Sequence, residues 1–202
     1  MEELRTARRF LKKARYPYPI DETEFFILNE HTTHGEIGGY LDAIERGDNI
    51  GLLSEAGLPC VADPGAMIVR VAQRRGIEVV PLVGPSSLML ALMASGLNGQ
   101  SFAFNGYLPV DKSQRASAIR RLEERARRER QTQLFIEAPY RNNQLLEALC
   151  TVLQPDTDIC VACDLTLPSQ YIRTLPAKQW QKEREKTNLH KRNTVFLIGT
   201  AG

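Results

Sequence analysis

The sequence predicts an α/β protein of two α/β domains, the first with a mainly parallel sheet and the second with a mixed sheet. In the first half, short apolar runs alternate with stretches of helical periodicity, which is the pattern of βαβ units. In the second half, two apolar runs follow one another with no helix between them, which indicates a mixed sheet. A polar, glycine-containing stretch at residues 95–100 separates the halves, so we expect domains at residues 1–98 and 99–202.

The chain opens with a helix over residues 2–15, where apolar side chains recur at helical spacing. Two prolines within residues 16–19 end it, because proline disfavours helix in the residue before it. Residues 25–28 read as a short buried strand. A helix over residues 35–46 follows and ends at Gly47.

The next apolar run, residues 50–53, predicts a second strand. A helix containing Met67 and Ala72 comes after it and ends at Gly76. Residues 77–83 predict the third strand, and residues 88–94 an apolar helix. Strands and helices of these lengths in alternation favour parallel pairing in this half.

Beyond residue 100 the pattern changes. Alternating aromatic residues predict a strand at 102–107, and an arginine-rich helix is expected at 114–130. Residues 134–137 predict a strand, followed by a helix that ends at Leu153. Three further strands are expected at residues 159–165, 171–175 and 194–199.

Length and composition exclude several classes of protein. With 202 residues and 43% hydrophobic content, the chain is long enough for one large or two small globular domains. No apolar run approaches the roughly 18 residues of a membrane span, and the basic first helix does not resemble a signal peptide. The four cysteines lack the density of a disulfide scaffold, which favours a reducing cytoplasmic location. Cys160 and Cys163 form a C-x-x-C without the second ligand pair of a metal site, so we interpret both as core residues.

The net charge is only +2, but positive charge is concentrated locally. The segment between residues 115 and 130 contains seven arginines and only three glutamates. A second group occupies the first helix: Arg5, Arg8, Arg9, Lys12, Lys13 and Arg15. Such clusters can bind phosphate backbones. They are equally typical of a solvated helix face with i,i+4 ion pairs, and the sequence leaves both interpretations open.

Two loops rich in glycine and proline follow predicted strands, at residues 54–65 and 81–87. In parallel α/β sheets, ligands collect at the carboxyl ends of strands, so these loops would frame one cleft. Glycine lets a backbone approach a ligand closely, and proline stiffens a loop. The alternative is two ordinary strand-to-helix turns.

These loops, S-E-A-G-L-P-C-V-A-D-P-G at 54–65 and P-L-V-G-P-S-S at 81–87, resemble the two signature loops of the tetrapyrrole methylase superfamily. Three further stretches resemble its branch that 2′-O-methylates a ribose in bacterial small-subunit ribosomal RNA. They are residues 2–8, residues 104–109 (F-N-G-Y-L-P) and residues 137–141 (E-A-P-Y-R). The likeness extends over nearly the whole chain.

The resemblance implies that S-adenosylmethionine binds in a cleft between the two domains, that the substrate is RNA and that the protein is a homodimer. It places the following residues beside the cofactor: Ser54, Glu55, Gly57, Pro59, Asp63, Gly84, Pro85, Ser86 and Tyr140.

Three residues are candidates for catalysis. Glu30 and His31 end a predicted strand at the expected cleft, and a histidine with a near-neutral pKa can accept a proton. Arg5 would contact an anionic substrate. The alternatives are a surface histidine, a helix-capping glutamate and an arginine paired with a carboxylate.

The chain departs from the family pattern in three places. Residues 29–33 read N-E-H-T-T where the branch has His-Glu-His-Asn-Glu, and residues 163–167 read C-D-L-T-L where it has Arg-Glu-Leu-Thr-Lys. Family members also carry a strand, a helix and a strand ahead of residue 2, inside the first sheet. We therefore expect an upstream segment that this sequence does not contain.

The expected function is an S-adenosylmethionine-dependent methyltransferase acting on a ribose 2′-hydroxyl of ribosomal RNA. One alternative is the same chemistry on a small tetrapyrrole-like molecule, which predicts a roomy, apolar cleft mouth. The other is a non-catalytic RNA-binding relative. The arginine-rich segments favour a polyanionic substrate.

Overall fold

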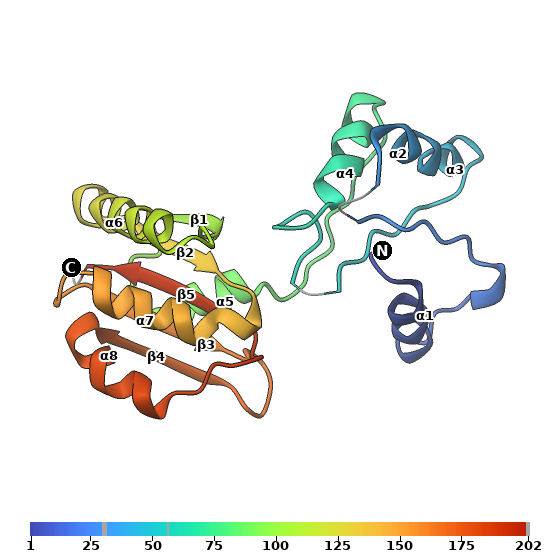
Figure 1. Cartoon of the computed structure of the whole chain (residues 1–202). Coiled ribbons are helices and arrows are strands. Elements are labelled where there is room, and N and C mark those ends of the chain that lie inside the picture. Colours follow the sequence, from blue (N-terminus) through green and yellow to red (C-terminus); the bar gives the residue numbers. More distant parts are fainter. Residues whose placement is uncertain (30–31, 56, 201–202) are drawn as a thin grey trace. The chain divides into compact units, whose positions relative to one another are not determined.

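A five-stranded sheet organises the second half of the molecule (Figure 1). The structure, a computed structural model, describes residues 1–29, 32–55 and 57–200. Contacts divide the chain into two units, Met1–Pro85 and Ser86–Gly202. The sheet lies wholly within the second unit.

The strand order is β1-β2-β5-β3-β4. The strands are β1 (Phe102–Tyr107), β2 (Thr132–Ile136), β3 (Asp158–Cys163), β4 (Tyr171–Pro176) and β5 (Thr194–Gly199). β1 and β2 are parallel, whereas β2 with β5, β5 with β3 and β3 with β4 are antiparallel. The mixed sheet predicted for this half is therefore confirmed.

Helices cover both faces of this sheet. On one face α5 (Ser87–Ser95) packs on Leu134, Cys160 and Leu197. On the other face the core contains Phe135, Val161 and Phe196 and is covered by three helices. These are α6 (Lys112–Glu129), α7 (Asn142–Val152) and α8 (Ala177–Glu183). Successive residues of β2 and β3 thus enter opposite cores, as the period of two in a strand requires.

The cysteine pair follows the same alternation. Cys160 belongs to the α5-facing core and Cys163 to the other core, and both are fully buried. Their thiols therefore lie on opposite faces of one strand and cannot share a ligand. No metal-binding group of His, Cys, Asp or Glu occurs in the described ranges of the chain. Both cysteines are core residues, as predicted.

The boundary between the units differs from the one expected after residue 98. Helix α5 is apolar on most of its surface and packs on β4 and β5, so it belongs with the second unit. Thr174 on β4 donates a hydrogen bond from Oγ1 to the carbonyl of Ser95 at 2.7 Å. Leu97, which follows α5, packs closely over Gly199 on β5: a β-carbon at position 199 would lie only 3.1 Å from Cδ2 of Leu97.

The first unit is helical in its regular parts. It contains α1 (Leu4–Lys13), α2 (His34–Tyr40), α3 (Asp42–Glu45) and α4 (Gly65–Arg74). Short 3₁₀ helices are η1 (Ile20–Glu22) here and η2 (Pro139–Arg141) and η3 (Arg184–Lys186) in the second unit. The core of the first unit contains residues from α2 and its C-cap, from α4 and from the extended segment before α2. They are Leu28, Ile37, Leu41, Ile68 and Ala72.

The mainly parallel sheet predicted for the first domain is wrong for the residues that the structure describes. Residues 25–28, 50–53 and 77–83 form no strand. A strand is stabilised by a hydrogen-bonded neighbouring strand, and no described residues of this unit form such a strand beside these apolar runs. Met1 instead pairs with residues 26–28, donating to the Phe26 carbonyl at 3.2 Å and accepting from Leu28 N at 2.8 Å. A hollow of about 750 Å³ lies beside two of the runs.

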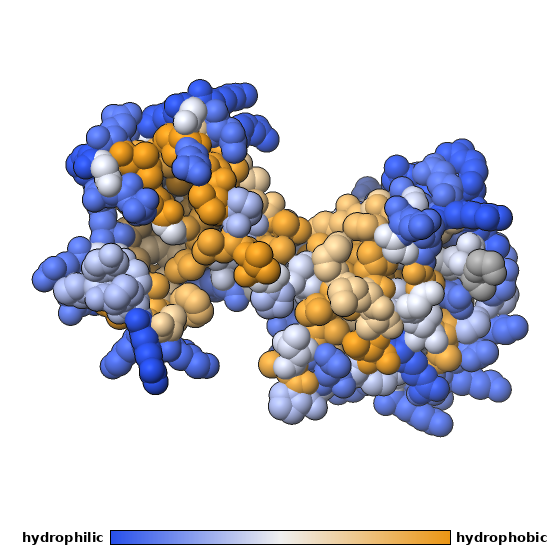
Figure 2. All heavy atoms as spheres, turned by 180° about the vertical axis from the view of Figure 1, so that it is seen from behind, coloured by the Kyte–Doolittle hydropathy of each residue, from blue (hydrophilic) through white to orange (hydrophobic). Residues whose placement is uncertain are grey.

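Apolar side chains reach the surface of this unit, as Figure 2 shows in orange. Val80, Leu82 and Val83 are 65%, 86% and 106% exposed.

Every helix in the described part of the chain is too short or too polar to cross a lipid bilayer.

Candidate functional site

The first glycine-rich loop is held in shape by the carboxylate of Asp63. Its Oδ1 accepts hydrogen bonds from Cys60 N at 3.0 Å and Gly65 N at 2.7 Å. A β-carbon on Gly65 would lie 2.7 Å from that oxygen, so only glycine fits where α4 begins. Within the segment that Asp63 holds, Cys60 and Ala62 adopt positive φ values of 69° and 54°. Non-glycine residues seldom adopt this conformation, and such strain concentrates at functional sites.

The same loop is tied to the N-terminus of α1. Glu55 N donates to Oε1 of Glu2 at 3.3 Å. Burial and the carboxylate of Asp63 raise the pKa of the Cys60 thiol, so this sulfur stays protonated near neutral pH and is a poor nucleophile. The loop therefore presents backbone groups, and no reactive side chain from Cys60, to a ligand.

The second loop lies beside the first at Gly84 and Leu58, both in the first unit. Glycine has no β-carbon, but one placed on Gly84 would lie 3.9 Å from Cδ2 of Leu58, at ordinary van der Waals distance. Gly57 has a φ of 75°, and a β-carbon there would meet nothing within 4 Å. Both glycines are exposed, and their N–H groups form no hydrogen bond within the part of the chain that is described. The two loops that the sequence predicted to frame one site therefore lie side by side at these two residues.

The remaining predicted cofactor residues fall into two groups. Ser54 and Pro59 lie on the first loop and Pro85 lies on the second, all in the first unit. Ser86 and Tyr140 belong to the second unit. Ser86 is the N-cap of α5, where its hydroxyl accepts from Met89 N at 3.4 Å.

Tyr140 is held by an ion pair at the carboxyl end of β2. The side chain of Glu137 is fully buried, and its Oε1 accepts from Arg141 Nη2 at 2.6 Å and from Ala138 N at 2.7 Å. The bond to Glu137 raises the pKa of Arg141, which stays charged. Arg141 Nη1 then donates to the Tyr140 hydroxyl at 3.0 Å, and its guanidinium lies 5.0 Å from the ring. Tyr140 is 59% exposed, so the pair displays its ring to solvent.

Sequence reasoning missed the role of Glu137, although the signal was present. An acid follows a buried strand and an arginine follows four residues later, a spacing that brings the two side chains together in a helical turn. The second carboxylate oxygen of Glu137 is buried without a hydrogen bond among the described residues.

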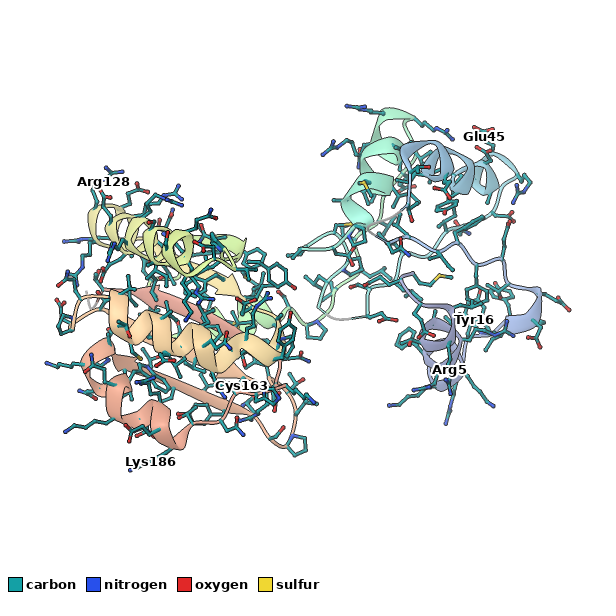
Figure 3. All side chains as sticks on the ribbon, in the orientation of Figure 1. Arg5, Tyr16, Glu45, Arg128, Cys163 and Lys186 are labelled. Atoms are coloured by element: carbon teal, nitrogen blue, oxygen red, sulfur yellow. The ribbon has the colours of Figure 1, made fainter. Side chains whose placement is uncertain are left out.

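The candidates for catalysis are less completely placed. Glu30 and His31 lie outside the described residues. Thr33 caps α2 in a capping box with Glu36, accepting from Glu36 N at 3.5 Å. Arg5 is exposed on α1 (Figure 3) and forms no ion pair with another described residue. Arg8 on the same helix pairs with Asp21.

A second strained turn closes β3 in the second unit, at one of the departures from the family pattern. Asp164 and Thr166 have φ values of 49° and 69°. Burial alone would raise the pKa of Asp164, but hydrogen bonds from Arg192 at 2.8 Å and Ser169 at 2.9 Å hold it below its ordinary value. This carboxylate organises the turn from within.

Comparison with known proteins gives a family match over most of the chain. The model of the family described as Tetrapyrrole (Corrin/Porphyrin) Methylases matches residues 3–181. Ribosomal RNA small subunit methyltransferase I of Pseudomonas aeruginosa is 35% identical over 155 residues, which is 77% of this chain and 54% of that protein. The protein of the same name from Bacillus subtilis is 36% identical over 158 residues, 78% of this chain and 52% of that protein. The chain thus spans about half the length of these relatives.

Two solved structures of methyltransferases have a similar fold. The methyltransferase CobJ superposes with a TM-score of 0.61 at 20% identity, covering 93% of this chain and 79% of that one. The cobalt precorrin-4 methyltransferase CbiF gives a TM-score of 0.54 at 15% identity, covering 89% and 77%. At these identities the likeness shows the fold alone.

Proposed function

The chain belongs to the tetrapyrrole methylase family, and from this premise we propose that it transfers a methyl group from S-adenosylmethionine to a ribose 2′-hydroxyl of small-subunit ribosomal RNA. The names of the relatives from P. aeruginosa and B. subtilis support the substrate. The observation that supports the site assignment is the proximity of the two glycine-rich loops at Leu58 and Gly84.

The residues present fit this cofactor. The exposed backbone groups at Gly57 and Gly84 suit the charged amino-acid part and the adenine edge of the ligand, and no β-carbon blocks either approach. The proposed binding residues are Ser54, Glu55, Gly57, Pro59, Asp63, Gly84, Pro85, Ser86 and Tyr140. The bound cofactor supplies a methyl group on a sulfonium, and the chain positions the ribose oxygen in line with it.

Proton transfer falls to the residues that follow the segment 25–28. We assign His31 as the acceptor of the ribose hydroxyl proton and Glu30 as the residue that orients the histidine or the ribose. Exposed Arg5 would pair with a phosphate of the substrate. These three roles derive from the sequence pattern and the family resemblance.

The wider assembly forms part of the same proposal. The sequence predicted domains at residues 1–98 and 99–202, whereas contacts divide the chain after Pro85. The family resemblance favours a cofactor that is bound by residues of both domains. The family resemblance also favours a homodimer in the cytoplasm. Analytical ultracentrifugation tests the dimer, and a monomer at micromolar concentration would contradict it.

Two measurements test the proposed function. Isothermal titration calorimetry of the full gene product with S-adenosylmethionine is expected to show one site per chain. Ribosomal RNA from a strain lacking the gene is then incubated with protein and cofactor and hydrolysed in alkali. A 2′-O-methyl group blocks hydrolysis at one linkage, so a single protected position is expected in the small-subunit RNA. Cofactor binding without a protected position would contradict the RNA substrate and favour a small one.

A further inference from the structure

The arginine-rich helix α6 has two different flanks. On the flank facing the loop between α7 and β3, charges are paired. Arg127 Nη2 donates to Asp156 at 2.6 Å, and Arg127 Nε lies 3.8 Å from Glu123. Glu123 is buried and also accepts from Gln154 N at 2.8 Å and from the Thr157 hydroxyl. This flank holds the helix on the unit and accounts for one of its three glutamates.

On the opposite flank, two of the three arginines have no carboxylate partner among the described residues. Arg121 and Arg125, four residues apart, are both exposed, and neither forms an ion pair with a described residue. Arg128 continues the same row three residues later and points away from the helix in Figure 3. Its partner is the adjacent Glu129 at 3.0 Å, which accounts for the second glutamate.

Glu124 is the third glutamate of α6, and it is exposed on the solvent face together with three arginines, Arg120, Arg121 and Arg125. Like charges at i,i+4 destabilise a helix by a few tenths of a kcal/mol, so Arg121 and Arg125 weaken α6 rather than support it. Ion pairing of a solvated face therefore explains the Arg127 flank but does not explain this one. The asymmetry separates the two interpretations that the sequence left open.

We infer that the flank formed by Arg121, Arg125 and Arg128 is a docking surface for the phosphate backbone of the substrate RNA. This inference rests on the proposed function and deepens it by assigning the surface that holds the RNA. Successive phosphates lie several ångströms apart along a strand, and a row of guanidinium groups spaced at one helical turn provides a matching series of cations. The surface contacts the backbone, so it contributes affinity without base specificity.

The same unit offers a matched control. Lys178 and Lys182 on α8 are also exposed and four residues apart. Helix α8 packs on β3 and β4, at the other end of the strand order from β1. The hydrogen bond from Arg127 lowers the pKa of Asp156, and the charge of Lys178 contributes to this shift. Glu183 follows Lys182 in sequence but pairs with Arg173. The pair Lys178→Gln/Lys182→Gln removes the same charge from a different surface of the unit.

The test is a binding titration of fluorescently labelled small-subunit ribosomal RNA with the full protein over a series of salt concentrations. Arg121→Gln/Arg125→Gln is expected to weaken binding roughly tenfold and to reduce the slope of log K against log salt by about 1 to 2. Lys178→Gln/Lys182→Gln should match the unchanged protein in both. Glutamine preserves helix propensity, and circular dichroism together with calorimetric cofactor binding confirms that each variant is intact.

The outcomes separate this inference from the proposed function. If the unchanged protein binds the RNA but the arginine variant binds equally well, the docking surface is overturned and the RNA substrate stands. An equal loss in both double variants would also overturn it, because total charge would then explain the effect. If the unchanged protein binds cofactor but no RNA, the proposed substrate fails and the docking surface fails with it.

Discussion

Gly84 faces Leu58 across the two glycine-rich loops of the first unit, where a β-carbon on Gly84 would lie 3.9 Å from Leu58 Cδ2. Leu58 and Gly84 are 26 residues apart in sequence, and the described residues around them form no strand ladder. Because a β-carbon on Gly84 would meet no other atom within 4 Å, a side chain at this position would fit the fold but enter the proposed cofactor site.

Gly84→Leu is therefore expected to leave folding intact and to weaken S-adenosylmethionine binding at least about tenfold, or about 1.4 kcal/mol. Calorimetric titration measures the affinity. Gly39→Ala in α2 is the control, since a β-carbon there meets nothing within 4 Å and its φ is not positive. Equal affinity in Gly84→Leu and Gly39→Ala would place the cofactor elsewhere.

Glu137→Gln should lower the free energy of unfolding by about 2 kcal/mol, because it leaves the Arg141 guanidinium without its carboxylate. Urea denaturation followed by circular dichroism measures the change. Arg173→Gln is the comparison: its 2.6 Å pair with Glu183 is 45% and 26% exposed, and its loss should cost less than about 1 kcal/mol. A loss of unfolding free energy in Glu137→Gln that is equal to or smaller than the loss in Arg173→Gln would contradict this prediction.

Cys150 predicts a pH dependence of stability at alkaline pH. Burial raises the pKa of its thiol to about 11, whereas an unfolded cysteine titrates near 8.5. Between these values the unfolded chain has lost the proton and the folded chain retains it, so stability falls as pH rises through this window. Cys150→Ala should flatten the fall in thermal stability between about pH 8.5 and 10.5. Parallel pH profiles for the two proteins would show that the thiol titrates normally.

Hydrogen exchange should distinguish the two units. Amides in β2, β3 and β5 are paired on both sides and are expected to exchange slowly. Residues 50–53 and 77–83 form no strand, so their amides should exchange orders of magnitude faster. Peptide-resolved mass spectrometry measures both. Slow exchange in residues 50–53 would reveal a ladder that this structure lacks.

Local sequence patterns predicted the second unit well because its elements are set by short-range periodicity. Helix α6 and strands β2 and β5 occur close to their expected positions. Helix α8 was missed, since only Ala177 and Trp180 of its seven residues are buried and the rest read as a polar loop. The expected helix at 35–46 is divided at Leu41, which follows two consecutive glycines and a tyrosine in α2.

The first unit shows what local patterns cannot supply. Residues 50–53 have the composition of a buried strand, but a strand also needs a hydrogen-bonded neighbour, and the pattern does not say where that neighbour comes from. In the candidate site, the motif located both loops. It did not reveal that Asp63 shapes the first loop or that Cys60 and Ala62 adopt positive φ, because these depend on the surrounding backbone.

Ultraviolet crosslinking of S-adenosylmethionine labelled in its methyl group, followed by peptide mapping, tests most directly whether the two loops hold the methyl donor. We predict label on peptides containing residues 54–65 and 81–87, and loss of both in Gly84→Leu. Label confined to peptides away from these loops, with the Gly84→Leu pattern unchanged, would contradict the assignment.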